Sequence, residues 1–561
     1  MKIILSIVIS SVVLAACATT QPAEEAIPLD TPAVEEEGES IPSEDPLIMF
    51  PIDMPYDLDD FAEPEFVPAG GSLSLSMRMP LTLNPLLNED ITVARILRLI
   101  YEPLIGLDTE LRPESRLLES FEIAPDGNSA TLVLREGLTW DNGFPITASD
   151  ILFSFNTLMN SSEYSVYRPN IEGVSSVSSA GHTITLNLSH TVNYAFLQRL
   201  NFPIIPSHHF SGAGSSLPSS PTNMTPIGNG PFRFINYRPA QEMVLSPNNL
   251  SLRPRPNIGR IRVVITPDDD TDVHAFNNGV IDVLRLESAT QIMHNPSRQT
   301  TVTPYINGHF EFIGFNFNND IMAQLPFRRA VAHALNIDSL VSSTYLNKAE
   351  RAITPINPSA WFHDNNTIIL PQNISLANTL LDEAGLGSLT PDGMRGTQAA
   401  GAVFDFSIRI LVNNENKERL IVADALAEAL RALRISAEVV RLDFEDYVFA
   451  LNSGNFDIFI GGLNVPSYGD ISFAFASGGE MNVFGYSNTI MDAFLEIVST
   501  ATTELEFHSS MSELQHFFAY DIPVIGLVYR KAALLTSGDI IGELSPSINN
   551  IYKNIQEWFI S

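Results

Sequence analysis

The sequence predicts an α/β fold divided into two or three lobes. A strand over 404–412, a helix over 416–434 and a strand over 436–442 follow one another, which is typical of a right-handed crossover in a sheet covered by helices. Roughly 490 residues follow the first 69, more than one hydrophobic core usually serves. The chain is 45% hydrophobic and has one cysteine, so packing rather than disulfides must hold the lobes together.

The chain opens with an apolar run that ends at Cys17, its only cysteine. The run over 3–16 is too short to cross a bilayer, which needs about 20 residues, but it suits a signal peptide. The sequence Leu14-Ala15-Ala16-Cys17 is similar to the bacterial lipoprotein signal. We therefore expect residues 1–17 to be a signal peptide and lipobox, with lipid attached at Cys17. The alternative is an ordinary secretory signal that contains a cysteine by chance.

Residues 18–69 are expected to form an acidic disordered linker. They contain 15 acidic residues and no Lys or Arg, a composition that cannot bury enough apolar surface to fold. An acidic metal site is the alternative to a solvated charge run. The whole chain has a formal charge of −34, which argues against nucleic acid as a partner because phosphate binding needs a basic surface.

After residue 70, hydrophobic alternation and turn residues predict further elements in order. Strands are expected over 72–76, 130–134, 232–237, 260–266 and 310–317, and helices over 93–101 and from Pro326 onward. Residues 203–231, rich in Pro, Ser and Gly, indicate a boundary. A strand over 456–460 should end at Gly461-Gly462.

Several side chains are predicted to cap helices. Thr147 and Asp150 have the spacing of a capping box, and Asp338 and Asp443 can each start a helix. Asp268 is expected to do the same, because its neighbours lack the Gly and Glu that a calcium loop requires.

The motifs of catalysis and cofactor binding are missing from the sequence. Gly228-Asn229-Gly230 lacks the third glycine of a dinucleotide site, and no phosphate loop or Gly-x-Ser-x-Gly elbow is found. The pair His208-His209 has no further ligand at metal-binding spacing. We therefore expect no catalytic residues, no cofactor and no metal, and hence no enzyme.

Short motifs follow one another in a fixed order from residue 80 to residue 386. They are PLTLNP at 80–85, IYEPL at 100–104, LREGLTWDNG at 134–143, PITASD at 145–150, GNGPF at 228–232, GVID at 279–282, FN at 315–316, RRAVAHAL at 328–335 and LLDEAGL at 380–386. The series resembles the solute-binding proteins of peptide-type ABC importers, the oligopeptide, dipeptide and nickel-binding family (family 5), and the resemblance spans nearly everything after residue 70.

This resemblance implies a two-lobed periplasmic-binding-protein type II fold with an extra α+β domain inserted in lobe one. Lobe one would comprise 70–100, 228–308 and 520–561, the inserted domain 101–227, and lobe two 309–519. The ligand would be enclosed between the lobes by hinge closure.

The resemblance also implies a function. We expect a monomeric lipoprotein, anchored to the bacterial cell envelope by its N-terminal lipid and facing the periplasm or cell exterior. It would capture a peptide or peptide-like solute and deliver it to an ABC permease complex. The alternatives are a lipoprotein of the same fold used for signalling or adhesion, or one that binds an oligosaccharide or another non-peptide solute.

Three regions are candidates for ligand contact. The predicted residues are Met77 and Arg78 after the first strand, Trp361, and Gly461, Gly462, Leu463, Asn464, Tyr468 and Asp470 after a lobe-two strand. Arg328 and Arg329 are expected to make structural contacts instead of contacting the ligand. The turn at 140–143 is also expected to have a structural role.

The third region departs from the family pattern. Peptide-binding members often carry Trp-x-x-Asp there, in which the aspartate pairs with the peptide's amino group, but this chain has Leu463-Asn464-Val465-Pro466. Unless Asp470 replaces that aspartate, ligands with blocked or absent amino termini should bind at least as well as free peptides, because a buried ammonium without a partner is costly.

Overall fold

The computed structural model describes residues 70–288 and 298–561, which fall in a single compact unit. The predicted signal peptide, the lipid site Cys17 and the acidic linker lie outside the described residues. In the described ranges, no helix is long and apolar enough to cross a membrane.

The first sheet has four strands in the order β1-β10-β9-β8. Their bounds are β1 (Ser72–Met77), β10 (Arg260–Ile265), β9 (Glu242–Pro247) and β8 (Phe232–Arg238). β1 runs parallel to β10 and the other pairs are antiparallel. Helix α1 (Ile91–Ile100) buries its apolar residues against this sheet, and α5 (Asp269–Asn277) follows β10.

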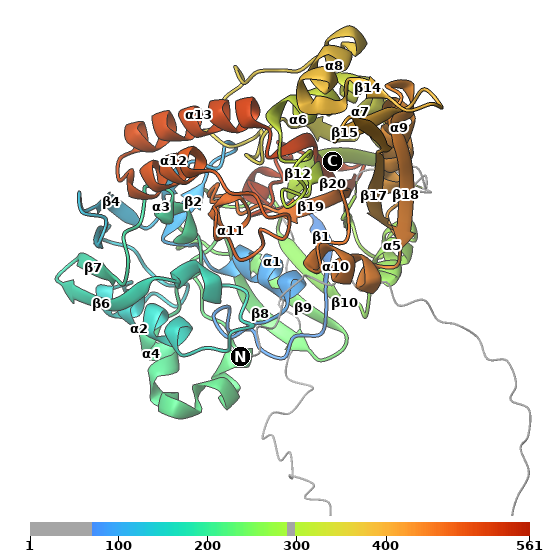
Figure 1. The fold of residues 1–561 in the computed structure, drawn as a ribbon. Coiled ribbons are helices and arrows are strands. Elements are labelled where there is room, and N and C mark those ends of the chain that lie inside the picture. The colour runs from blue at the N-terminus through green and yellow to red at the C-terminus, as the bar shows by residue number, and fades with distance from the viewer. Residues whose placement is uncertain (1–69, 289–297) are drawn as a thin grey trace, which may run out of the picture. The chain divides into compact units, whose positions relative to one another are not determined.

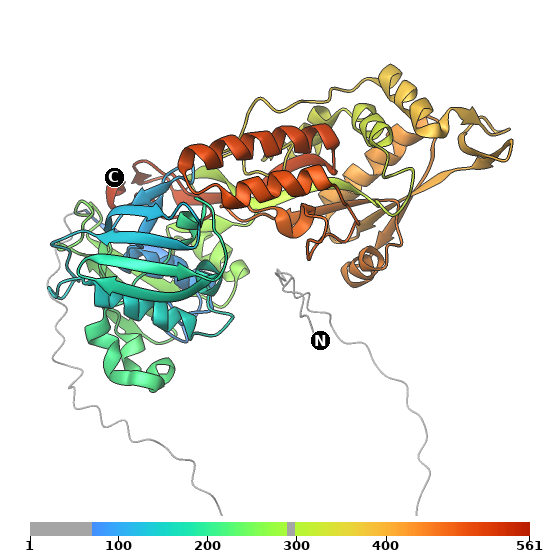
Figure 2. The ribbon, with the colours of Figure 1, turned by 60° about the vertical axis from the view of Figure 1, so that its left-hand side comes forward.

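The inserted part is built on a second four-stranded sheet, visible in cyan in Figure 2, with the order β4-β5-β7-β6. The strands are β4 (Leu118–Ile123), β5 (Ser129–Leu134), β7 (Thr183–Leu188) and β6 (Val174–Ala180). Around them lie β2 (Ile105–Leu107), β3 (Pro113–Ser115), α2 (Ala148–Met159), α3 (Phe196–Arg199) and α4 (Ser207–Phe210). Side chains of both sheets, such as Leu73 and Leu132, belong to one hydrophobic cluster, so the inserted part shares a core with the first sheet.

The third sheet has seven strands, six of them in the order β11-β20-β12-β19-β17-β18. They are β11 (Val283–Leu286), β20 (Val524–Ser537), β12 (Thr300–Phe315), β19 (Ile458–Asn464), β17 (Ser407–Asn413) and β18 (Ser436–Leu442), with β13 (Ala349–Arg351) paired to β20. Figure 1 shows α9 beside β17 and β18, and α12 and α13 side by side.

The remaining elements surround this sheet or follow it. They are α6 (Leu325–Ala334), α7 (Ile337–Tyr345), α8 (Ile374–Leu381), α9 (Lys417–Ala432), α10 (Phe444–Asn452), α11 (Ser472–Phe475), α12 (Thr489–Thr500), α13 (Glu504–Asp521), and the short strands β14 (Ser388–Leu389), β15 (Arg395–Ala399), β16 (Ala402–Asp405), β21 (Ile540–Ile541) and β22 (Phe559–Ile560).

The long strands β12 and β20 connect two hydrophobic cores. On β20, Leu527 and Val528 belong to a core with α6 and α9, whereas Ala532 and Leu534 belong to the core of the first sheet. Strand β12 also contains residues predicted for lobe one and residues predicted for lobe two, as expected of a segment that crosses between lobes. The domain boundaries themselves remain a prediction.

The structure confirms several predicted elements. The strand over 436–442 is β18, and Asp268 and Asp443 accept hydrogen bonds at the N-termini of α5 and α10. Thr147 and Asp150 form the predicted capping box of α2. The turn at 140–143 is also present, since Gly143 N donates to Trp140 O at 2.9 Å.

Three local predictions were wrong. Asn336, not Asp338, caps α7, because the Asn336 side chain accepts from Ser339 N at 3.0 Å. The strand expected over 404–412 is divided between β16 and β17, which belong to different sheets. The strand expected to end at Gly461-Gly462 continues to Asn464, because its residues pair with β12.

Gly462 explains this last error. A Cβ atom at this position would lie 2.6 Å from His309 Nε2 and 2.7 Å from Arg419 Nη2. The glycine therefore marks a close approach within the sheet rather than the end of a strand.

Candidate ligand-binding site

A cavity of about 290 Å³ lies where α1, two segments of the inserted part, residues 466–468 after β19 and residues 548–551 meet. Stretches that are far apart in the chain thus enclose it. It is lined by Ile91, Ala94, Arg95, Arg98, Val166, Tyr167, Pro169, Asn170, Gln198, Arg199, Asn201, Pro466, Ser467, Tyr468, Ile548, Asn549 and Ile551. This mixture of apolar walls and a few polar groups is typical of small-molecule sites.

Helix α1 supplies two of the three arginines in this lining. Asp90 caps the helix by accepting from Thr92 N and Val93 N, and the buried side chains of Val93, Ile96 and Leu97 fix its apolar face. Arg95 and Arg98 are three residues apart, so they lie on one face of the helix and both reach the cavity.

Buried polar atoms without a partner gather at this cavity. Four lining side chains contain such atoms: Gln198 Oε1, Asn201 Oδ1, Arg199 Nε and Asn549 Nδ2. Two of these atoms accept hydrogen bonds and two donate them. An unpaired buried polar atom costs about 1–3 kcal/mol. Neighbouring atoms cover these four atoms in this conformation, so a bound molecule can pair with them only after the side chains shift.

A second cavity of about 210 Å³ shares Arg199 and Tyr468 with the first. The Arg199 guanidinium lies 5.7 Å from the centre of the Tyr468 ring, and burial raises the pKa of Tyr468. Asp470 lines this second cavity and accepts from Ser472 N at 2.9 Å and Ser472 Oγ at 2.6 Å.

A larger hollow of about 880 Å³ lies between β4 and the facing ends of α12 and α13. Its lining contains four glutamates, Glu122, Glu504, Glu506 and Glu513, and no arginine or lysine. Among the described residues, none of the buried unpartnered polar atoms belongs to this lining. The smaller cavity at α1 is therefore the better candidate for a polar ligand.

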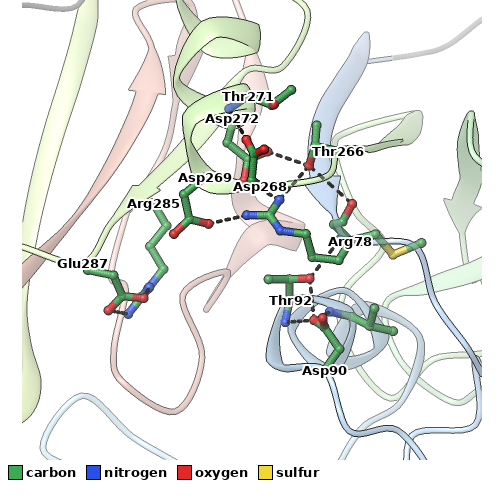
Figure 3. A network of polar contacts seen from close by, with 12 residues as sticks. Arg78, Asp90, Thr92, Thr266, Asp268, Asp269, Thr271, Asp272, Arg285 and Glu287 are labelled. Carbon is green, nitrogen blue, oxygen red and sulfur yellow. Dashed lines mark hydrogen bonds and ion pairs between the residues drawn. The ribbon is translucent and has the colours of Figure 1, made fainter. Parts of the chain in front are cut away.

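Among the predicted site residues, Tyr468 lines the candidate cavity. Met77 is fully buried in the core of the first sheet. Arg78 is held by Asp269 and by Asp272, whose Oδ2 lies 2.9 Å from Arg78 Nη1, and it also donates to Thr266 (Figure 3). In this structure, neither Met77 nor Arg78 is among the residues that line the cavity.

Trp361 lies in an aromatic cluster rather than at the cavity. Its ring contacts those of Tyr194, Phe362 and Phe507, and the Arg112 guanidinium lies 5.3 Å from its centre. Since Tyr194 belongs to the inserted part, Trp361 packs that part against the helices that follow β19.

The four residues Gly461, Gly462, Leu463 and Asn464 belong to strand β19. Leu463 is buried, and Asn464 Oδ1 lies 2.9 Å from His309 Nδ1 of the neighbouring strand. The arginines expected to be structural are indeed so: Arg328 donates to the carbonyl oxygens of Ile522 and Asp521, and Arg329 donates to that of Tyr520.

Arg95, Arg98, Arg199 and Asn549 were not predicted from the sequence. The sequence held a signal for Arg95 and Arg98, because they are the only charged residues in the mostly apolar segment 91–100. The sequence held no such signal for Arg199 and Asn549, since these residues reach the cavity only through the packing of distant segments.

Comparison with known proteins identifies the family. Residues 112–481 match the model of the bacterial extracellular solute-binding proteins, family 5 (middle). The chain belongs to this family. It is therefore an extracellular solute-binding protein with the two-lobed type II fold, as the resemblance implied.

Individual family 5 proteins are similar over most of the chain. The oligopeptide-binding protein AppA of Bacillus subtilis is 22% identical over 505 residues, which cover 88% of this chain and 92% of AppA. The substrate-binding protein CtaP of Listeria monocytogenes has a similar structure, with a TM-score of 0.69 and 21% identity over 88% of this chain and 99% of CtaP. A nickel ABC transporter structure from Bacillus halodurans has a TM-score of 0.71 and 16% identity over 86% of this chain and 98% of its own.

The structural similarity to a nickel transporter does not extend to a group of metal ligands in the described residues. Within residues 70–288 and 298–561, no three His, Cys, Asp or Glu side chains are grouped so that they could hold a metal ion.

Proposed function

We propose that this chain captures a peptide-like solute in the cavity between α1 and Pro466–Tyr468 and delivers it to an ABC importer. The observation that carries the proposal is the lining of the cavity, where the amide side chains of Gln198, Asn201 and Asn549 and three arginines offer both donors and acceptors among apolar walls. A peptide group presents one donor and one acceptor, so a short peptide can satisfy both kinds. The names of relatives, among them an oligopeptide-binding protein, support this class of solute.

The volume of the cavity limits the ligand. At about 290 Å³ it lies near the lower end of the 300–1,000 Å³ usual for ligand pockets. A peptide of two or three residues with small side chains therefore fits this proposal better than a long one.

Native mass spectrometry of the chain without residues 1–17, purified gently, tests this function. We expect co-purified masses that fragment as short peptides. The matched variant is Tyr468→Ala, which removes one wall of the cavity and should lower the fraction of protein that carries ligand. Co-purified sugars, or no change with Tyr468→Ala, would contradict the proposal.

Recognition of the ligand's amino terminus is tested separately by titration with the same peptide in free and acetylated forms. In this structure Asp470 lines the adjoining cavity and is occupied with Ser472. We expect the acetylated form to bind at least as well. Tighter binding of the free amine, weakened by Asp470→Asn, would assign the amino-group role to Asp470.

We further propose that Cys17 carries a lipid that holds the monomeric protein at the outer face of the membrane. Acyl chains contribute about 0.8 kcal/mol per buried methylene. Cys17→Ser should therefore release the protein into the soluble fraction, whereas the control Thr20→Ser, which leaves the cysteine in place, should stay with the membrane. Retention of Cys17→Ser in the membrane after a high-salt wash would show that another feature anchors the chain.

A further inference from the structure

We propose that Arg95 binds a carboxylate of the captured ligand. This inference rests on the proposed function and deepens it, because it names the chemical group by which the solute is recognised. The carboxylate can belong to a peptide C-terminus or to an acidic side chain, and the experiment below separates the two sources.

The lining of the cavity is positively charged. Three arginines, Arg95, Arg98 and Arg199, line it, and its lining contains no Asp or Glu. This is a local concentration of positive charge in a chain whose formal charge is −34. A cavity lined by one sign of charge attracts ligands of the opposite sign, and low-dielectric walls strengthen the attraction.

Two of these arginines already have partners. Arg98 Nη2 donates to Asn201 O at 2.8 Å, and Arg199 Nη2 donates to Pro169 O and Glu172 O, each at 2.8 Å. Their guanidinium groups therefore hold the walls of the cavity together.

Arg95 differs from both. Within the part of the chain that the structure describes, its guanidinium makes no hydrogen bond and no ion pair. Arg285, one of the charges that act on it, is held by Glu287 and by Tyr305 Oη, while the nearby Asp269 pairs with Arg78. Arg285 and Asp269 are thus committed to other groups, and Figure 3 shows the pairs Arg285–Glu287 and Arg78–Asp269.

The surroundings of Arg95 make its positive charge costly. Burial, together with the charge of Arg285, lowers the pKa of Arg95 to about 10. The side chain still carries its charge at neutral pH. An anion beside it would offset both the burial and the repulsion from Arg285.

A carboxylate suits this position better than a neutral acceptor. A guanidinium can donate two parallel hydrogen bonds to the two oxygens of a carboxylate, and such charge-assisted bonds are about twice as strong as neutral ones.

The test uses the chain without residues 1–17 and mixtures of N-acetylated tripeptides that contain no charged side chains. One mixture has free C-terminal carboxylates and the other has C-terminal amides. A second pair of mixtures, both amidated, carries either Glu or Gln at the middle position. Binding is measured by native mass spectrometry and calorimetry for the wild type, Arg95→Gln, Arg95→Lys and the exposed control Arg441→Gln.

We expect the wild type to prefer at least one carboxylate form over its neutral match by tenfold or more. A preference for C-terminal acids assigns Arg95 to the peptide end, and a preference for Glu over Gln assigns it to a side chain. Arg95→Gln should abolish the preference, because it weakens binding of the carboxylate form more than binding of its neutral match. Arg95→Lys should retain part of it, and Arg441→Gln all of it.

Equal binding of carboxylate and neutral forms by the wild type would overturn the assignment, and this comparison does not depend on the folding of any variant. It would leave the peptide-binding function intact. A preference that persists in Arg95→Gln would also overturn the role of Arg95. If none of the four mixtures binds, the proposed function fails, and this inference fails with it.

Discussion

Substitution of Glu311 by Gln should strongly destabilise the seven-stranded sheet. The Glu311 side chain is fully buried, and its Oε2 accepts from Arg419 Nε at 2.8 Å. Arg530 Nη2 and His309 Nε2 lie 2.5 and 3.1 Å from its Oε1. These contacts join β12, β20 and α9, so the carboxylate links two strands of the sheet to a helix that covers it.

The magnitude follows from the burial of the partners. The Arg419 side chain is 10% exposed, whereas those of Arg530 and His309 are 22% and 26% exposed and can recover some hydration. Removing one partner of a buried ion pair costs about 3–5 kcal/mol because the remaining charge is left uncompensated. We expect Glu311→Gln to lower the free energy of unfolding by about that amount.

Urea unfolding at pH 7, followed by circular dichroism, measures this loss. Amide hydrogen exchange of peptides from β12 and α9 shows whether the loss is located at this sheet. The matched control is Asp424→Asn, since Asp424 pairs with Arg441 on the surface, where the two side chains are 55% and 46% exposed. Such exposed pairs contribute about 0–1 kcal/mol. If the two variants were equally stable, the reasoning from burial would be refuted.

The pH dependence supplies a second check. Burial by itself would raise the pKa of Glu311, but the charges of Arg419, Arg530 and His309 outweigh it and hold the pKa well below its usual range. A carboxyl with a depressed pKa contributes stability that is present above its unfolded pKa, about 4.3, and is lost as the pH falls through the folded value. The stability difference between wild type and Glu311→Gln should therefore narrow as the pH falls below about 4.

Two further predictions concern Gly228, where the second predicted segment of lobe one begins, and Asp150 in the inserted part. A Cβ atom at Gly228 would lie 2.0 Å from the carbonyl oxygen of Ile100, the last residue of α1. Gly228→Ala should therefore lower the free energy of unfolding by about 1–3 kcal/mol. The control Gly478→Ala, which places a Cβ atom in open space, should change the free energy of unfolding by less than about 0.5 kcal/mol. Thermal melting compares the two, and equal melting temperatures would contradict the clash. Asp150→Ala should cost about 2–4 kcal/mol, because Asp150 both caps α2 and accepts from Ser207 N and Oγ at 2.7 Å. Asp443→Ala, which removes only a cap, should cost about 1 kcal/mol in urea unfolding, and an equal loss in both variants would rule out the extra contribution.

Local features of the fold could be predicted from the sequence because they depend on residues close together in the chain. The capping box at Thr147 and Asp150 and the caps at Asp268 and Asp443 involve side chains and backbone amides within one helical turn. Strand β18 was predicted with its observed bounds because its neighbours in sequence mark both ends. The ordered motifs likewise predicted the family, and the match over residues 112–481 confirms this prediction.

The α/β class, most local elements and the family of solute-binding proteins could be predicted from local patterns along the chain. Which residues form the cavity could not, because Arg95, Arg199, Tyr468 and Asn549 come from four distant segments that long-range packing brings together. The tertiary structure also decided that Arg78 is paired with Asp269 and Asp272, about 190 residues away in the chain, and that Arg95 is not paired within the described residues. Neighbouring residues in the sequence do not determine whether a charged side chain forms an ion pair. Ion pairing depends on the long-range packing that brings an opposite charge within a few ångströms.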